Sequence, residues 1–340
     1  MQLSDFDYDL PQEQIAQIPL EKRDASRLLV FDRATGQIFH TLFSQIGDFL
    51  NPGDLLVINR TRVLAARLFA TKIPTGGKVE LLLLNQREPG VWEVMVGGKR
   101  VRQGIHLRIR DELSAEVLED LGGPRRLLRF NQLLADQLDQ IGQMPLPPYI
   151  HERLQDPERY QTVYSRETGS AAAPTAGLHF TPELLESMQQ AGISIAEVTL
   201  HVGLDTFAPV TEEDVTQHQI HSEWCQLSPE TVEKINQTRQ QGRRIVAVGT
   251  TSVRTLETGA QVSQNPGEVT AFEGQTELFI LPGYHFSAVD AMVTNFHLPK
   301  STLLMLVSAF AGRERILAAY KTAVDEGYRF FSFGDAMLIL

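Results

Sequence analysis

Small residues and one histidine are concentrated at positions 170–181, a stretch whose composition is typical of a ligand-binding loop. Consecutive alanines and Gly177 allow backbone built from this stretch to approach a ligand closely. His179 adds an imidazole, a group that can accept or donate a proton near neutral pH. Phe180 adds an apolar ring, and Thr181-Pro182-Glu183 then reads as the start of a helix. The stretch is therefore a candidate binding loop that ends at a helix N-terminus.

Four further polar groups occur at or beyond the ends of predicted strands, where open α/β sheets bind ligands. They occupy positions 201–207, 249–252, 295–300 and 333–335. We expect them to meet the 170–181 loop in one crevice. The Gly-Thr-Thr-Ser run at 249–252 offers hydroxyls and backbone amides to an anion or a ribose, but it lacks the known nucleotide-binding fingerprints. By itself this run favours a capped turn between a strand and a helix over a binding role.

Histidine and cysteine usage gives little support for a metal site. The single cysteine, Cys225, excludes an internal disulfide and argues against a zinc–thiolate centre. The close pair His218 and His221 lacks the spacing of a metal motif. We predict no metal. His221 with Trp224 offers a charged group beside a stacking ring, although Trp224 is equally suited to a core.

The residues before 59 and after 141 have the pattern of an α/β domain. A proline-stiffened segment at 144–149 returns the chain to this domain, and helices and strands then alternate. We expect helices at 43–50, 182–191, 229–241, 301–311 and 313–326, and a helix start at 9–13. We expect strands at 26–32, 55–58, 193–200, 244–248, 277–281, 289–294 and 329–332, with a hairpin turn at Thr35-Gly36.

Residues 59–141 have a different sequence pattern, with six short β-type runs separated by turn residues. Such closely spaced strands predict a small antiparallel β-barrel or sandwich. The predicted fold is therefore an α/β main domain with an inserted small antiparallel β-domain, for which we expect the form of a β-barrel. The domains are a discontinuous α/β catalytic domain (1–58 and 142–340) and the inserted barrel (59–141).

Charge is unevenly distributed along the 340 residues. The net charge of −11 argues against a nucleic-acid partner, but residues 51–150 carry 14 Lys and Arg against 11 Asp and Glu. The barrel region is thus locally basic and is a reasonable place to meet nucleic acid, unless these are only scattered solvated charges. The N-terminus is acidic rather than basic and apolar, and no apolar run approaches the length of a membrane span. We therefore expect a cytoplasmic protein without a membrane partner.

Long motifs, in order, relate the chain to a known family. The chain closely resembles the S-adenosylmethionine:tRNA ribosyltransferase-isomerase family of bacterial queuosine biosynthesis, nearly from end to end. The motifs that carry the resemblance lie at Pro19-Leu20, Arg23–Leu28 (RDASRL), 52–55 (PGDL), 144–150 (MPLPPYI), 159–164 (RYQTVY), 172–181 (AAPTAGLHFT), 199–204 (TLHVGL), 221–224 (HSEW), 247–254 (AVGTTSVR), 294–312 and 328–337.

The resemblance implies an enzyme that transfers the ribosyl part of S-adenosylmethionine onto 7-aminomethyl-7-deazaguanine at the tRNA wobble position and isomerises it. The product is epoxyqueuosine in tRNA, and adenine and methionine are released. S-adenosylmethionine is the co-substrate, and no bound cofactor or metal is expected. The implied partner is a tRNA with a GUN anticodon, and the implied state is a monomer. An α/β domain with an inserted barrel is also the family's architecture.

The implied reaction needs a base, hydrogen-bond donors for the departing adenine and groups that hold the amine of the substrate. The following residues are candidates for these roles. The catalytic candidates, which the sequence does not rank, are His179, His201 and His297. The substrate-binding candidates are Arg27, Thr175, Gly177, Phe180, Gly203, Gly249, Thr250, Thr251, Ser252, Arg254, Asn295 and Asp335, with Phe180 or Phe296 available to stack on a purine. The tRNA-binding candidates are Arg60, Arg62, Lys99 and Arg100.

Two departures from the family pattern limit this transfer of roles. Arg60 stands where many members have Asp, which removes any role for a carboxylate there and adds a positive charge. Glu277 stands where Asp is common, so its side chain is one methylene longer. Two other functions stay open: an enzyme acting on a small molecule without RNA, and a non-catalytic RNA-binding module.

Overall fold

The chain forms two compact units. The computed structural model describes residues 1–134, 137–203 and 210–340. One unit comprises Met1–Arg62, Pro148–Glu167 and Ala173–Leu340, and the other comprises Val63–Pro147 with Thr168–Ala172. The first unit is built on a large mixed sheet with helices, and the second on a closed barrel. The predicted fold class is therefore confirmed.

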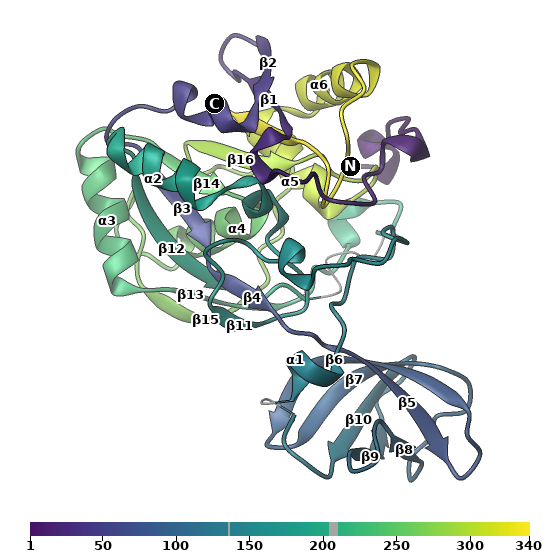
Figure 1. Ribbon diagram of the computed structural model, residues 1–340. Coiled ribbons are helices and arrows are strands. Elements are labelled where there is room, and N and C mark those ends of the chain that lie inside the picture. The colour runs from purple at the N-terminus through teal and green to yellow at the C-terminus, as the bar shows by residue number, and fades with distance from the viewer. Residues whose placement is uncertain (135–136, 204–209) are drawn as a thin grey trace. The chain divides into compact units, whose positions relative to one another are not determined.

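The first unit contains a nine-stranded sheet (Figure 1). Its central strands run parallel, because β3 pairs in parallel with β12 and β14, and β14 pairs in parallel with β16. β17 then runs antiparallel to β16 and parallel to β1. In spatial order the strands are β15 (Phe272–Thr276), β13 (Glu223–Leu227), β12 (Ser194–Leu200), β3 (Leu55–Asn59), β14 (Ile245–Val248), β16 (Ala291–Asn295), β17 (Ala336–Ile339), β1 (Arg27–Phe31) and β2 (Ile38–Leu42).

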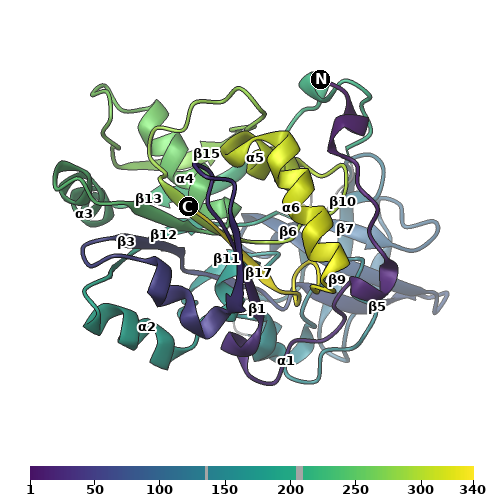
Figure 2. The same ribbon diagram turned by 90° about the horizontal axis from the view of Figure 1, so that it is seen from above.

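Helices cover both faces of this sheet, as Figure 2 shows for α4, α5 and α6 on one side and α2 on the other. Successive residues of β3 divide between the two cores, with Val57 on the first face and Leu56 on the second. Such burial on both faces explains why the central strands are continuous apolar runs. The first face is covered by α3 (Pro229–Gln240), α4 (Thr250–Gln261), α5 (Thr302–Ala311) and α6 (Arg313–Asp325). The second is covered by α2 (Pro182–Gln190) and the 3-10 helices Phe43–Phe49 and Thr175–His179.

Side-chain caps begin three of the helices. Thr181, Ser228 and Ser301 each accept a hydrogen bond from the backbone N–H three residues later, at 3.1–3.2 Å. Two of these helices have a proline at the first position, Pro182 in α2 and Pro229 in α3, whereas α5 has none. These are the start signals expected from sequence, because a cap satisfies an otherwise unpaired backbone donor. The predicted helix after the 170–181 loop is confirmed.

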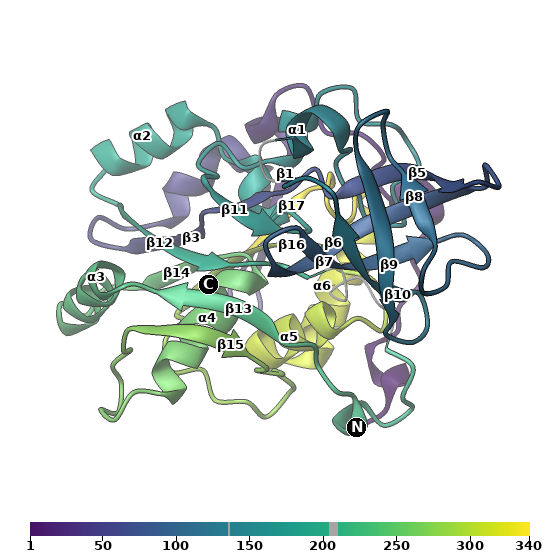
Figure 3. The same ribbon diagram turned by 90° about the horizontal axis from the view of Figure 1, so that it is seen from below.

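The second unit contains a closed six-stranded antiparallel barrel (Figures 1 and 3). Alternate residues such as Ala115 and Val117 point into its own apolar core, which is the pattern expected of a small barrel. One helical turn, α1 (Leu138–Ile141), follows the last strand. In order around the barrel the strands are β10 (Arg125–Phe130), β7 (Val91–Gly97), β6 (Lys78–Glu88), β5 (Arg67–Ile73), β8 (His106–Arg108) and β9 (Ser114–Asp120). The short strands β4 (Thr61–Val63) and β11 (Glu167–Ser170) form a separate two-stranded sheet.

Two predicted strands are wrong. The final strand is β17 rather than 329–332, because Phe331 has φ of 70°, a conformation that breaks an extended strand. The strand expected at 277–281 lies earlier, as β15, which ends at Thr276. The apolar residues that follow β15 pack on the core without joining the sheet. The predicted helix at 43–50 is a 3-10 helix, and the predicted start at 9–13 gives only the turn Gln12–Gln14.

Helix α4 and strand β13 were not predicted. The sequence of α4 is rich in threonine and has a glycine, so its intrinsic helix propensity is poor. Nearly all of its residues are buried, and packing therefore decides its conformation. Among the residues described, no helix has both the length and the apolar composition that a membrane span requires.

Candidate functional site

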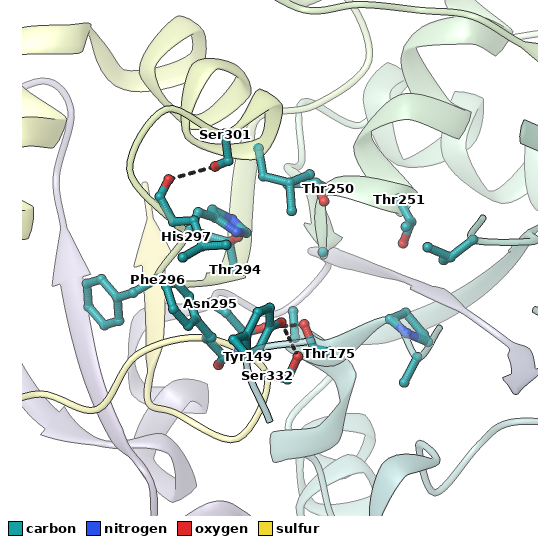
Figure 4. A pocket seen from close by; sticks show the side chains of 18 of the residues that line it. Tyr149, Thr175, Thr250, Thr251, Thr294, Asn295, Phe296, His297, Ser301 and Ser332 are labelled. Carbon is teal, nitrogen blue, oxygen red and sulfur yellow. Dashed lines mark hydrogen bonds between the residues drawn. The ribbon is translucent and has the colours of Figure 1, made fainter. Parts of the chain in front are cut away.

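A pocket of about 300 Å³ opens at one edge of the large sheet (Figure 4). The 170–181 loop lines it through Thr175, and two of the four predicted polar groups line it through Gly249 to Thr251 and Asn295 to Lys300. The 201–207 group contributes only Val202, and the 333–335 group does not line the pocket. Tyr149, Thr294, Ser301, Phe331 and Ser332 complete its polar and aromatic lining. We call it the Asn295 pocket. A concave, mostly apolar space with a few convergent polar groups is the usual form of a small-molecule site.

Strand direction explains why these groups meet. β14 and β16 are parallel, so the residues that follow them lie at the same edge of the sheet. The backbone N–H of Gly249 donates to the carbonyl of Val293 at 2.8 Å and ties the two strand ends together. β17 runs the opposite way, with Ala336 opposite Asn295, so the residues that precede β17 reach this edge.

Asn295 joins three segments of the site. Its side-chain oxygen accepts a hydrogen bond from the Thr175 hydroxyl at 2.8 Å. Its amide nitrogen lies 3.1 Å from Nε2 of His179 and donates to the carbonyl of Phe331, also at 3.1 Å. The side chain is only 3 % exposed. Because all its hydrogen bonds are internal, Asn295 fixes the shape of the pocket as well as lining it.

His179 lies beneath Asn295 rather than in the pocket. Its Nδ1 is 2.8 Å from Oγ of Ser26, and its ring stacks on Phe43 with centroids 5.0 Å apart. An amide N–H at Nε2 requires that nitrogen to accept, so the neutral Nδ1–H form fits the network. Burial, followed by the positive charges of Arg329 and Arg23, lowers the pKa of His179 to about 3. The neutral imidazole therefore holds Asn295 in place.

His297 is the one histidine among the three candidates that lines the Asn295 pocket. Its Nε2 is 2.7 Å from the Thr294 hydroxyl, and its backbone N–H donates to Tyr320 at 3.0 Å. Burial lowers the pKa of His297 to about 3, so the ring is neutral at pH 7. A neutral ring offers one donor and one acceptor, and Thr294 uses only Nε2.

His201 lies outside that pocket. It stacks on Trp224 with centroids 4.9 Å apart, and its Nδ1 is 3.0 Å from the Thr61 hydroxyl. Burial lowers the pKa of His201, although Glu167 opposes the shift. The neighbouring Val202 does line the pocket. Positions 204–209 of the same predicted group lie outside the described residues.

The Gly249–Ser252 run is both a helix start and part of the pocket. Gly249 has φ of 84° and precedes the first turn of α4, a conformation that favours glycine. Thr250 and Thr251 line the pocket, and the buried Oγ1 of Thr251 has no hydrogen-bond partner among the residues described. Ser252 differs, because its hydroxyl donates to the Val248 carbonyl within the helix at 2.8 Å.

Arg254 is held in a buried ion pair with Glu223. Its Nε also donates to the carbonyl of Leu278 at 3.1 Å, and Gly203 donates its backbone N–H to Glu223 at 2.8 Å. Arg254 and Glu223 are 7 % and 3 % exposed and border a separate space of about 30 Å³. Arg254 and Gly203 therefore contribute to packing beside the pocket and do not line it.

Four other predicted substrate-binding residues lie in structural positions. A Cβ on Gly177 would be 2.1 Å from the Tyr164 hydroxyl, so glycine is needed there for packing. Phe180 is fully buried, edge-on to Phe43, and Phe296 is also fully buried within an aromatic cluster, although it borders the pocket. The guanidinium of Arg27 lies 3.8 Å above the ring of Tyr328. Asp335 accepts the backbone N–H groups of Arg27 and Arg329 at 2.9 and 2.8 Å, and burial raises its pKa.

The four predicted tRNA-binding residues differ in their surroundings. Arg60 lies 3.5 Å from Glu167 and 3.7 Å from Glu197, and Arg62 pairs with Glu158. Lys99 and Arg100 are exposed in the turn after β7, and no acidic side chain pairs with them in the described part of the chain. The charge of the two arginines near position 60 is thus compensated, whereas that of Lys99 and Arg100 is not.

Sequence reasoning missed several lining residues. Tyr149 and Ser332 share a hydrogen bond of 2.7 Å at the pocket wall, and Phe331 has a positive φ of 70°. Tyr149 belongs to the proline-rich segment, which was expected only to return the chain to the main domain. The positive φ of Phe331 has no sequence signal because the residue is not glycine. No cluster of three or more metal-binding side chains occurs in residues 1–134, 137–203 and 210–340.

Comparison with known proteins identifies close relatives. Residues 3–339 match the model of a family described as queuosine biosynthesis protein. The chain is 57 % identical to S-adenosylmethionine:tRNA ribosyltransferase-isomerase of Symbiobacterium thermophilum and 54 % identical to that of Desulfitobacterium hafniense, each over 344 aligned positions and the full length of both chains. A crystal structure of S-adenosylmethionine tRNA ribosyltransferase from Thermotoga maritima is 43 % identical, with a TM-score of 0.59, and the match covers 99 % of this chain and 100 % of that one.

Proposed function

The chain belongs to the queuosine biosynthesis protein family, and we propose that the Asn295 pocket is where it acts as an S-adenosylmethionine:tRNA ribosyltransferase-isomerase. The enzyme transfers the ribosyl moiety of S-adenosylmethionine to 7-aminomethyl-7-deazaguanine in tRNA and isomerises it to give epoxyqueuosine. Adenine and methionine are released. The observation that carries the location is the convergence of three loops from distant parts of the chain on one pocket.

The pocket suits a ligand with polar and apolar parts. Its volume of about 300 Å³ falls at the lower end of ordinary small-molecule sites. Thr250 and Thr251 lie at the first turn of α4, where backbone donors and the helix dipole favour electron-rich oxygens. Thr251 Oγ1 also needs a partner that the described residues do not provide. We assign these groups to the ribose or the carboxylate of S-adenosylmethionine.

We assign proton transfer to His297, because it borders the pocket while His179 supports Asn295 and His201 stacks on Trp224. The reaction requires a base for a proton next to the sulfonium and donors for departing adenine. The pKa of about 3 makes His297 neutral, so it can accept a hydrogen bond or proton without first losing one. Such a weak base acts effectively only when the ligand is held against it, which is the role of the surrounding loops.

The names of the relatives support a tRNA as the RNA partner. We propose a tRNA with a GUN anticodon, a monomeric enzyme and a cytoplasmic location. Of the four candidates, Lys99 and Arg100 are better suited to a phosphate backbone, because they are exposed and lack acidic partners within the described residues. Arg60 and Arg62 are weaker candidates, since carboxylates already compensate their charge.

The test follows adenine release from S-adenosylmethionine in three parallel reactions. One contains tRNA that carries 7-aminomethyl-7-deazaguanine, one contains the same tRNA with unmodified guanine, and one contains no RNA. We expect adenine only in the first. Equal release in all three would favour a small-molecule enzyme, and no release in any would reject the proposed activity. Repeating the first reaction with a tRNA that carries the same modified base but a second anticodon base other than U tests the anticodon assignment.

A further inference from the structure

A second, smaller cavity adjoins the Asn295 pocket. It has a volume of about 20 Å³, and Ser332 lines both spaces. His179 forms part of its wall and is linked to Asn295 by the 3.1 Å hydrogen bond. Two arginines, Arg23 and Arg159, also line it. The cavity therefore lies directly behind the residues that shape the pocket.

Three arginines around this cavity bind only backbone carbonyl oxygens. Arg23 donates to Leu178 at 3.1 Å and to Glu158 at 2.8 Å. Arg159 donates to the carbonyls of Leu20 and Glu21 at 2.5 and 2.9 Å. Arg329 donates to the carbonyls of Ile18, at 3.3 Å, and Phe333, which lines the cavity.

No carboxylate forms an ion pair with any of these three arginines in the part of the chain that the structure describes. The nearby Glu158 pairs with Arg62, and Asp156 caps the 3-10 helix Pro157–Tyr160. Burial, followed by the charge of Arg159, lowers the pKa of Arg23, although Asp156 and Glu158 oppose this shift. Asp335 likewise opposes the burial that lowers the pKa of Arg329. Nearby carboxylates therefore compensate these charges in part without pairing directly with them, and an anion in the cavity would be attracted by the remaining positive charge.

The three arginines also have N–H donors that no hydrogen bond to the described residues uses. A guanidinium has five N–H groups, and each of the three arginines makes two hydrogen bonds to the described residues. Nε of Arg159 is buried without a hydrogen-bond partner among the described residues. The volume of about 20 Å³ admits one water-sized group, so an incoming anion can place a single oxygen in the cavity while the rest stays outside.

We propose that Arg23 and Arg159, flanked by Arg329, form an oxyanion subsite that holds a backbone phosphate of the tRNA nucleotide whose base enters the Asn295 pocket. This assignment rests on the proposed function. A phosphate diester suits the cluster because guanidinium forks bind phosphate oxygens well and because a chain of phosphates can compensate several positive charges. The carboxylate of S-adenosylmethionine has the same oxygen chemistry and, like a single phosphate diester, one negative charge, so the experiment separates the two sources.

The experiment measures tRNA affinity as a function of KCl concentration for Arg23→Gln and Arg159→Gln, with Arg23→Lys as the charge-preserving variant. Each lost phosphate contact should reduce the slope of log affinity against log salt by about 0.7 to 0.9. We expect that reduction for both glutamine variants and a slope near wild type for Arg23→Lys. S-adenosylmethionine affinity should stay within about twofold of wild type, and thermal unfolding checks that each variant is folded.

Arg243→Gln is the matched control, because Arg243 is exposed and precedes β14 at the opposite edge of the sheet. It should leave the slope unchanged. An equal reduction for Arg243→Gln would make the effect one of net charge, and an unchanged slope for both cavity variants would overturn the proposal. A loss of S-adenosylmethionine affinity without a change in slope would assign the subsite to the carboxylate instead. Because tRNA binding is read without turnover, failure of the adenine assay in wild type would reject the proposed function separately.

Discussion

The side-chain amide of Asn295 lies 3.1 Å from Nε2 of His179, and this contact links the end of β16 to the end of the 170–181 loop. Ser26 holds the other ring nitrogen of His179 at 2.8 Å, so a segment before β1 is part of the same network. His179, one of the three catalytic candidates, thus supports Asn295 in the pocket wall. The position of Asn295 is therefore set by contacts from several distant segments.

We predict that Asn295→Ala lowers kcat/KM for adenine release by about 100-fold, because small displacements of a positioned group have effects of that size. Thr175→Val should have a smaller effect, since it removes one hydrogen bond of 2.8 Å and keeps the side-chain shape. Steady-state kinetics with the modified tRNA measure both.

Thr231→Val is the control for Thr175→Val. The buried Thr231 hydroxyl donates to the Glu197 carbonyl at 2.7 Å, away from the pocket, so its loss should lower stability without changing kcat/KM. Wild-type turnover in Asn295→Ala would contradict the proposed location of the site.

Protein stability should fall as the pH is lowered below about 6.5, because His179 and His297 are neutral when folded. Their folded pKa values of about 3 lie below the ordinary value of 6.5. The unfolded chain therefore binds more protons between these values, and each histidine contributes a slope of about 1.4 kcal/mol per pH unit. This stability is fully present above about pH 6.5 and is lost as the pH falls toward 3.

Urea unfolding of wild type, His179→Gln and His297→Gln over this range measures the slope. Each variant should show a shallower dependence than wild type. The buried carboxyls Asp335 and Glu257, whose pKa values burial raises, act in the opposite direction, so only the difference between proteins is diagnostic. The exposed His285 provides a control, since His285→Gln should leave the slope unchanged. Parallel curves for all four proteins would refute the assignment.

Gly177→Ala should destabilise the protein by about 1–3 kcal/mol, because the added methyl group has no room. Its Cβ would lie 2.1 Å from the Tyr164 hydroxyl oxygen and 2.8 Å from Cγ2 of Thr162. Tyr164→Phe alone should be nearly neutral, since this buried hydroxyl has no hydrogen-bond partner among the described residues. The double variant should recover part of the loss in thermal unfolding, and complete additivity would argue against this clash.

Salt dependence should distinguish the two pairs of predicted tRNA-binding residues. We predict that Lys99→Ala with Arg100→Ala reduces the slope of log affinity against log KCl by up to about two. Arg60→Ala with Arg62→Ala should reduce it less, because removing these arginines also frees the carboxylates that they compensate. Filter binding of tRNA at several salt concentrations measures both. A larger effect of the Arg60 and Arg62 pair would reverse this ranking.

The sequence by itself determined the fold class and most of the elements. Continuous apolar runs such as 55–58 predicted strands buried on both faces, and capped starts such as Thr181-Pro182 located helices, because both signals depend on neighbouring residues. The short alternating runs after residue 59 likewise predicted a barrel. Where local signals were weak, as in the threonine-rich α4, burial decided the structure.

Only the tertiary structure decided which polar residues share the pocket. Asp335 was expected to follow a strand and instead precedes β17, yet it lies at the predicted edge because β17 runs antiparallel to β16. The sequence did not rank the three candidate histidines, but the structure gives them different positions. His297 lines the pocket, His179 lies beneath Asn295, and His201 stacks on Trp224. Local sequence does not reveal partners that come from segments far away along the chain, as Ser26 and Asn295 do for His179. Such partners set the burial, charge and role of a side chain.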